Sequence, residues 1–333
     1  MATLSVRCAA RARSHHRFGL LLGLLLLPVR DASAQGLPAW APVNPAAASR
    51  SGLTFQPYVD PAPGRWRASV QVDYGSAIEY NLPSTERSWL FDAEVMRIGL
   101  GVVRDLGPST FALAELPLLG AYDGFLDGFL EWYHDLFGIA MPERDARPRN
   151  AFAYQLTTPS GTGTIRGRSG LFPGDLRLGL GYRYNSVLQT VGSVTLPTSI
   201  GPEGYGRGTV SVNAVTTLRA PFSSRFTYEG SLGVGFTPSD GELADLQREL
   251  FLSATSGLRF RFWGRQSLFA NLLYHSPYYE DVMLPALDRR ELSLDFGWIL
   301  ATGGGREWRI GMVEDLEPSG PGIDLVFRLG ANF

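Results

Sequence analysis

Cysteine and long apolar stretches are the two most informative absences in this chain of 333 residues. The one cysteine, Cys8, lies near the N-terminus, so the rest of the chain can form no disulfide. Beyond residue 34, no apolar run approaches the ~20 residues that a transmembrane helix requires. A disulfide-stabilised domain and a bundle of membrane-spanning helices are therefore both excluded.

The first 34 residues predict a secretory signal peptide. Four arginines (Arg7, Arg11, Arg13 and Arg17) precede an apolar run over 18–27, and Ala32-Ser33-Ala34 follows. The basic flank, the short apolar run and the A-x-A site are typical of a signal that is cleaved, here before Gln35. No cysteine follows that site, so a lipoprotein anchor is not expected. Cleavage takes the 30 basic and 32 acidic residues to 25 and 31, an acidic excess that argues against a nucleic-acid partner.

The last eleven residues show the clearest pattern of the chain. Polar or small residues mostly fill every second position of this stretch. The positions between them hold apolar residues: Ile323, Leu325, Phe327, Leu329, Ala331 and Phe333. Alternating side chains point to opposite faces of a strand, so one face is wholly apolar. A terminal aromatic residue closes such a strand in bacterial outer-membrane β-barrels. We expect Phe327, Leu329 and Phe333 to form the C-terminal signal that the barrel-assembly machinery reads.

Six further segments alternate in the same way, at 65–74, 175–184, 225–236, 250–262, 268–274 and 292–300. Every charged residue in the seven segments falls on the polar row. An arginine that faced lipid at the middle of a membrane would cost ~2–4 kcal/mol, which explains this segregation in a transmembrane barrel. A soluble β-sandwich also alternates, but it needs neither a signal peptide nor aromatic residues near strand ends, as at Trp66, Tyr74 and Trp298.

Counting back from Phe333 predicts twelve strands: 65–80, 89–104, 110–119, 174–184, 188–198, 208–219, 225–236, 248–262, 266–276, 290–301, 307–314 and 323–333. Tight links between them alternate with longer ones, as periplasmic turns and outer loops do. One more spanning strand at 151–158 would put the N-terminus outside, so that stretch belongs to an insertion or to an extra hairpin that makes fourteen. We predict an all-β transmembrane antiparallel barrel of twelve strands, with fourteen as the alternative. Its parts are a signal peptide (1–34), a periplasmic segment (35–64) and the barrel (65–333), which includes an outer-loop insertion at 120–173.

Residues 123–137 change to a helical period within that insertion. Phe125, Phe129 and Trp132 lie on an apolar face, and Asp127, Glu131 and His134 lie on the opposite one. We expect this helix to cover or partly plug the outer mouth of the barrel.

The same region carries a family resemblance. The stretch from Gly124 to Gly138, with Glu115-Leu116-Pro117 before it and Gly174-Asp175-Leu176-Arg177 and Leu196-Pro197-Thr198 after it, resembles an uncharacterised bacterial outer-membrane family, domain of unknown function 3187. The resemblance covers most of the chain beyond the signal. It implies an envelope location and no particular activity.

Few residues offer catalytic or metal chemistry. Glu131 and His134 lie one helical turn apart, but a carboxylate-bridged metal centre needs two such motifs, and a solvated helix face explains them better. His275 and Ser276 fall on opposite strand faces, whereas barrel lipid hydrolases resemble one another in carrying His and Ser on one face. We expect no metal, no cofactor and no enzymatic activity, with an outer-membrane lipid hydrolase as the lesser alternative.

The polar rows predict which side chains line the lumen: Arg67, Asp73, Asp175, Arg177, Arg183, Glu229, Arg259, Arg261, Glu291, Asp295 and Arg328. The two signs balance, which permits either an interior closed by ion pairs or a narrow, weakly selective pore. Paired glycines in the strands, as at 233 and 235, ease curvature or make room for large neighbours. We predict a passive pore or a barrel that binds a small solute; the alternative is a closed structural or surface-interaction barrel. The expected partners are outer-membrane lipid, the assembly machinery and a small solute.

Overall fold

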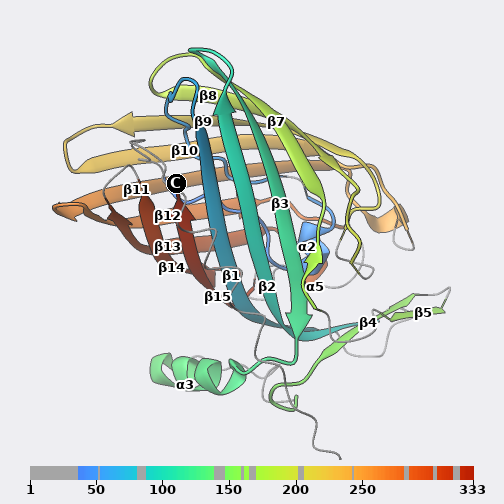
Figure 1. Ribbon diagram of the computed structural model, residues 1–333. Coiled ribbons are helices and arrows are strands. Elements are labelled where there is room, and N and C mark those ends of the chain that lie inside the picture. The colour runs from blue at the N-terminus through green and yellow to red at the C-terminus, as the bar shows by residue number, and fades with distance from the viewer. Residues whose placement is uncertain are drawn as a thin grey trace, which may run out of the picture.

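The computed structural model contains a closed barrel of twelve antiparallel strands (Figure 1). It describes residues 37–51, 53–80, 88–138, 147–158, 161–164, 170–201, 206–241, 244–280, 285–302, 306–317 and 323–333, so the predicted signal peptide lies outside the described residues. Around the ring the strands are β1 (Trp66–Tyr80), β2 (Ser88–Asp105), β3 (Thr110–Tyr122), β7 (Leu176–Arg183), β8 (Leu188–Leu196), β9 (Ser211–Pro221), β10 (Phe226–Phe236), β11 (Leu250–Trp263), β12 (Gln266–His275), β13 (Glu291–Ala301), β14 (Glu307–Asp315) and β15 (Leu325–Asn332).

The first and last strands close the ring. β1 pairs with β15 from Ser69 opposite Asn332 to Ser76 opposite Leu325. Beyond the paired strands, the backbone N–H of Phe333 donates to the carbonyl of Ala68 at 2.9 Å. The prediction of a twelve-stranded antiparallel barrel is confirmed, because each predicted strand is present within a few residues of its expected ends.

The extra strand-like stretch near 151–158 lies outside the ring. β4 (Ala153–Thr158) and β5 (Gly161–Thr164) form a hairpin, and β4 pairs with residues 88–92 of β2 beyond the end of β3. The two-residue β6 (Phe172–Pro173) pairs with β3. The alternative of fourteen barrel strands is therefore wrong, since β4 and β5 add to the end of β2 and take no place in the ring.

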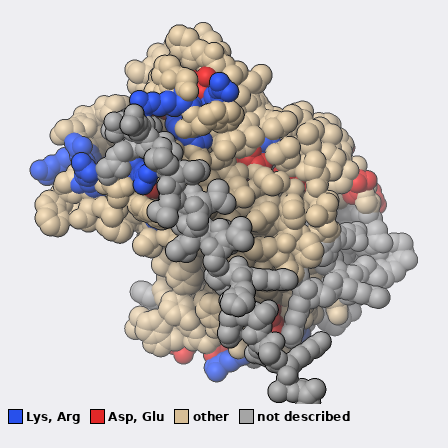
Figure 2. All heavy atoms as spheres, viewed as in Figure 1, with Lys and Arg blue, Asp and Glu red and all other residues tan. Residues whose placement is uncertain are grey.

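The two faces of the barrel wall differ as the alternation predicts. On the outer face, Leu232 is 71% exposed and Leu180 is 65% exposed, whereas Asp73 and Asp295 on the inner face are fully buried. In Figure 2, the part of the visible face that grey atoms leave open shows few charged side chains away from its edges, and arginines gather at its upper and left edges. An outer surface of this kind suits lipid, which solvates apolar side chains and penalises charge.

The largest departure from the predicted fold is the position of the N-terminal hairpin, which we define as the described residues between 37 and 59. The sequence predicts a periplasmic segment here, but the structure places the hairpin inside the barrel. Trp40 and Phe55 pair antiparallel through two backbone hydrogen bonds, of 3.2 and 2.9 Å, and the helix α2 (Pro45–Ala48) lies near the turn between the two arms. Leu37, Leu53 and Phe55 belong to one buried cluster with inner-face residues of the wall.

The hairpin spans most of the height of the lumen. Its second arm ends near the short turns, where the Tyr58 hydroxyl donates to the carbonyl of Asn185. Its tip lies near the long loops, where the Arg50 guanidinium donates to the carbonyl of Thr237. Its first arm begins toward the short-turn end, where the Leu37 N–H donates to Glu229, the carboxylate that also accepts from the Tyr58 N–H.

The predicted helix is present as α3 (Asp127–Phe137), but it does not plug the mouth. Leu126 and Leu130 pack on Leu325, Tyr74 and Phe327, which are outer-face residues of β15 and β1. No helix in the described part of the chain is long and apolar enough to cross a membrane. The expectation of a mouth or plug helix is therefore wrong: α3 lies against the outside of the barrel near its long-loop end, below β14 and β15 in Figure 1.

One buried carboxylate of the outer wall bonds the N-terminal end of this helix, and a second bonds the segment that follows it. Glu94 of β2 accepts hydrogen bonds from the backbone N–H groups of Phe125 and Leu126, at the N-terminal end of α3, where a negative charge is stabilising. Asp92, two residues away on the same face, forms a 2.8 Å ion pair with Arg147. Both carboxylates would be costly against lipid, so the insertion that covers them makes them tolerable.

The residues that the sequence assigns to this helix fall into two groups. The polar ones bond to neighbouring segments of the chain, and the apolar ones remain exposed. Asp127 is buried and accepts hydrogen bonds from the Ser76 hydroxyl and the Asn150 N–H. Glu131 pairs with Arg149, and His134 lies 3.2 Å from Asp324. The apolar side chains that remain exposed recur at helical spacing: Phe125 70%, Phe129 37%, Trp132 58% and Leu136 64%. The charged Asp135 is exposed as well.

We expect this exposed apolar stripe of α3 to lie in the acyl chains of the outer leaflet, because it continues the lipid-facing surface of β1 and β15. A fluorophore on cysteine at position 132 (Trp132→Cys) should be quenched by lipids that carry a spin label on the acyl chain. The control, Asp135→Cys on the same helix, should be quenched by aqueous iodide instead. Equal iodide quenching at both positions would contradict this placement.

Candidate functional site

The tip of the N-terminal hairpin is fastened to the long-loop end of the lumen by Arg50. This side chain is 2% exposed, and its Nη2 donates at 3.1 Å to the carbonyls of both Thr237 and Arg248. Burial lowers the pKa of the Arg50 guanidinium, while the nearby Tyr279 and Glu249 oppose that shift. A buried cation whose donors reach several carbonyls is a strong local anchor, because removing it would leave those carbonyls without partners.

A buried serine and histidine form the second anchor of the tip. Ser51 Oγ lies 2.6 Å from His275 Nε2, and it also accepts from the Leu53 N–H at 3.1 Å. His275 Nδ1 lies 2.6 Å from the carbonyl of Ser276, so Nδ1 carries the proton and Nε2 accepts from the serine hydroxyl. Tyr278 stacks on the imidazole with ring centroids 4.2 Å apart, and its hydroxyl donates to Glu291. Burial raises the pKa of Tyr278 well above its usual value.

The base of the hairpin is bonded to the other end of the lumen. Glu229 accepts from the N–H groups of Leu37 and Tyr58, so a single carboxylate joins both arms to β10. The Val59 N–H donates to Gln189 at 2.8 Å, and the Val59 carbonyl accepts from Arg183 at 2.6 Å.

Glycines of the wall provide the room that the hairpin occupies. A Cβ at Gly235 would lie 3.1 Å from Cγ of Leu53, and one at Gly233 would lie 3.0 Å from a methyl group of the same leucine. A Cβ at Gly257 would lie 2.7 Å from Leu37. The paired glycines of β10 therefore make room for a large neighbour, and that neighbour comes from the hairpin.

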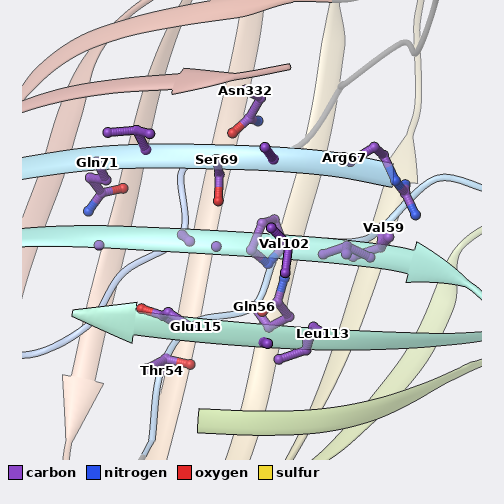
Figure 3. A pocket seen from close by; sticks show the side chains of 18 of the residues that line it. Thr54, Gln56, Val59, Arg67, Ser69, Gln71, Val102, Leu113, Glu115 and Asn332 are labelled. Carbon is purple, nitrogen blue, oxygen red and sulfur yellow. The ribbon is translucent and has the colours of Figure 1, made fainter. Parts of the chain in front are cut away.

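A cavity of about 480 Å³ remains between the hairpin and the inner face of β1, β2 and β3 (Figure 3). Gly99 and Gly101 of β2 add no side chain of their own to its wall, and the side chains of Arg97 and Ser69 lie against them. Its polar lining includes Thr54, Gln56, Ser69, Gln71, Glu115 and Asn332, and its apolar lining includes Trp40, Phe55, Val59 and Leu113. It continues to residues 60–65, which precede the first strand, and it therefore faces the short-turn end of the barrel.

Ten of the eleven residues that the sequence assigns to the lumen lie on its inner face, with the following partners. Arg67 and Arg183 pair with Asp105; Arg328 pairs with Asp73 and Asp295; Asp175 pairs with Arg207; Arg177 pairs with Glu115; Arg259 pairs with Glu307; Glu229 bonds the hairpin and Glu291 bonds Tyr278. Arg261 differs: it is exposed at the short-turn rim, where it donates to the carbonyl of Ser224.

The sequence missed the hairpin residues and the wall residues Arg97, Glu115 and Arg309 that line the cavity. One signal for the hairpin was available, since Leu37, Trp40, Leu53 and Phe55 are too apolar for a segment assigned to water. Arg97 lies in a strand whose alternation is irregular. Arg309 lies in a strand that alternates cleanly from Glu307 to Met312, so the alternation there was a signal for it. Among the described residues, no group of three or more potential ligand side chains is placed to hold a metal ion.

If Gly235 makes room for Leu53, adding side-chain volume there should displace the hairpin. We expect Gly235→Val to weaken hairpin docking by ~1–3 kcal/mol, as overpacking does, and to speed hydrogen exchange over residues 37–59. The matched control is Gly192→Val, because a Cβ at Gly192 meets nothing within 4 Å. Unchanged exchange in Gly235→Val, or equal changes in both variants, would contradict this role.

Comparison with known proteins yields one family and a set of barrels. The model of a family described as a protein of unknown function, DUF3187, matches residues 42–333. The crystal structure of the COG4313 outer membrane channel from Pseudomonas putida F1 is similar at 13% identity, over 83% of this chain and 99% of that one, with a TM-score of 0.51. The NanC porin is similar at 8% identity over 80% and 98% of the two chains, with a TM-score of 0.45, and the Pseudomonas putida toluene transporter TodX at 9% over 87% and 90%, with a TM-score of 0.40. None of the curated proteins matches the chain. At these identities the similarity shows the fold alone, which is that of an outer-membrane β-barrel.

Proposed function

Because the chain belongs to the DUF3187 family, which has no assigned activity, we propose from the lumen itself that the protein is a passive outer-membrane channel for a small solute, closed by its N-terminal hairpin. It would reach the membrane after export and cleavage near Ala34, with Phe327, Leu329 and Phe333 read by the assembly machinery. The short turns, and the end of the cavity at residues 60–65, would face the periplasm.

One observation carries this proposal: the lumen is filled by a separate element rather than by the wall. Side chains can fill the interior of an eight-stranded barrel, but twelve strands enclose more space. Here the hairpin occupies that space, and it still leaves a cavity of about 480 Å³ along β1, β2 and β3. The hairpin is held in the lumen by hydrogen bonds and by packed leucine side chains, so it can leave. Side chains that project from the strands of the wall could not leave in this way.

A closed barrel with a structural or surface-interaction role is the rival function. The observation that favours it is the apolar cluster in the lumen, in which Trp40, Leu53 and Phe55 of the hairpin pack among wall residues. Such a cluster is typical of a permanent core. The two functions differ in whether the hairpin moves, so an experiment that fixes the hairpin distinguishes them.

A disulfide between hairpin and wall provides that experiment. Leu53→Cys with Gly235→Cys would join the hairpin to β10, because a Cβ at Gly235 lies 3.1 Å from the Leu53 Cγ. That separation is compatible with disulfide geometry, and no cysteine other than Cys8 is present to interfere. We expect solute uptake into proteoliposomes to stop on oxidation and to return on reduction.

Each single-cysteine variant serves as a control and should respond to neither treatment. A variant that lacks residues 37–58 should conduct steadily in planar bilayers. If it and the wild type both fail to conduct while the barrel is folded, the channel proposal fails and the closed barrel is favoured.

The same proposal assigns Ser51 and His275 to holding the hairpin rather than to hydrolysis, since both are buried. We expect Ser51→Ala and His275→Ala to release the hairpin more readily, by ~1–3 kcal/mol for a lost buried hydrogen bond, as measured by hydrogen exchange over 37–59. Turnover of phospholipid or lipid A by the wild type, abolished in both variants, would instead support the lipid hydrolase alternative.

A further inference from the structure

Two cavities of the lumen meet at one cluster of charged residues. The larger cavity, of about 480 Å³, runs from the short-turn end along β1, β2 and β3. A smaller one, of about 50 Å³, lies beyond it toward the long loops and reaches Asp175 and Arg207. Five residues line both cavities: Ala41, Thr54, Arg97, Glu115 and Arg177.

The three charged members of this set form one network, which we call the Arg97–Glu115–Arg177 cluster. Glu115 accepts a hydrogen bond from Arg97 Nη2 through one oxygen and from Arg177 Nη1, at 3.2 Å, through the other. Arg97 also lies 3.6 Å from Asp73, and Arg177 Nε donates to Ser193 at 3.0 Å. Glu115 is the most exposed of the three side chains, at 22% against 8% for Arg97 and 5% for Arg177.

Among the side chains that line the larger cavity, arginines outnumber carboxylates. The larger cavity is lined by five arginines and two carboxylates: Arg65, Arg67, Arg97, Arg177 and Arg309, with Asp60 and Glu115. Three of these arginines, Arg67, Arg97 and Arg309, also lie near Asp105, Asp73 and Glu307, which do not line it. Among the described residues, Arg177 Nη2 and Arg309 Nε are buried without a hydrogen-bond partner. The other wall of the passage is the hairpin, which presents Trp40, Thr54 and Phe55. Cationic donors beside aromatic and aliphatic surface suit an organic molecule with one acidic group.

We propose that the Arg97–Glu115–Arg177 cluster is the selectivity site on the solute path, and that it favours small organic carboxylates over neutral and cationic analogues. This inference rests on the proposed channel function. A carboxylate reaching the cluster from the larger cavity competes with Glu115 for the two guanidinium groups. It can exchange hydrogen bonds there without leaving either arginine unpaired, which lowers the barrier for anions. A cation meets the two arginines, and at the cluster Glu115 is the one carboxylate that lines both cavities.

Transport and direct binding test the proposal together, in the full-length protein. Uptake of benzoate and of benzamide into proteoliposomes is compared with the equilibrium binding of both probes to the detergent-solubilised protein. We expect the wild type to prefer benzoate in both measurements. Arg177→Gln should reduce that preference about tenfold, since it removes one unit charge a few ångströms from the bound carboxylate. Arg177→Lys keeps the charge and should retain most of the preference.

Glu115→Gln changes the charge in the opposite direction with almost no change of shape, so it should increase the preference for benzoate. The matched control is Arg290→Gln, because Arg290 is exposed, pairs with Glu317 at 3.0 Å and does not line either cavity. That variant should leave the preference unchanged. Each variant is first checked for the resistance of a folded barrel to unfolding in detergent, and Glu115→Gln and Arg177→Lys remain informative if Arg177→Gln does not fold.

The outcomes separate the two proposals. Benzoate binding that depends on Arg177, without uptake in any variant, would retain the carboxylate site and overturn the channel. Uptake with equal rates for benzoate and benzamide, unchanged in Arg177→Gln and Glu115→Gln, would retain the channel and overturn the selectivity site. Neither binding nor uptake would overturn both.

Discussion

The interior of this barrel has to be filled, and most features of the structure follow from that requirement. Twelve strands enclose a volume that inward side chains alone do not occupy, and an empty apolar space of that size would forfeit packing contacts on every side. The N-terminal hairpin supplies the missing contacts. The wall glycines at positions 233, 235 and 257 leave the space that the leucines of the hairpin occupy. A side chain at any of these positions would collide with Leu53 or Leu37.

Filling the lumen also buries charge, and arginine makes this tolerable. All 30 basic residues of the chain are arginines, whose planar guanidinium carries five donors. Arg328 shows the advantage: its three nitrogens donate to Asp73, to Asp295 and to the carbonyl of Ala39 in the hairpin. A lysine ammonium at the same place could not match two carboxylates and a carbonyl in one plane. The wall charges thus pair with one another and hold the hairpin at the same time.

The strands were predictable from sequence because lipid imposes a simple rule on the outer face. The alternation around Leu232 and Leu180, with charges confined to the other face, is visible without any knowledge of partners. The rule fails where the protein itself covers the wall. Glu94 and Asp92 of β2 lie on the outer face, yet α3 and the following loop shield them, so alternation could not place them. The hairpin escaped prediction for a related reason: its short apolar stretches have no period, and their partners are distributed over β8, β10, β12 and β15. The cavity forms only where the hairpin packs against the barrel wall. The sequence of the hairpin alone, or of the strands alone, therefore does not predict it.

The placement of the hairpin constrains the order in which the protein can be assembled. The hairpin precedes β1, and the pairing of β1 with β15 is the seam that closes the ring. Its contacts lie on strands that are far apart in an open sheet and come together only in a closed ring, such as Glu229 on β10 and Arg328 on β15. A hairpin bound to both before the seam forms would draw the sheet into its curvature and act as a template for closure. A hairpin that arrives later has to thread through a ring that is already shut, so the two routes differ in which event limits the rate of folding.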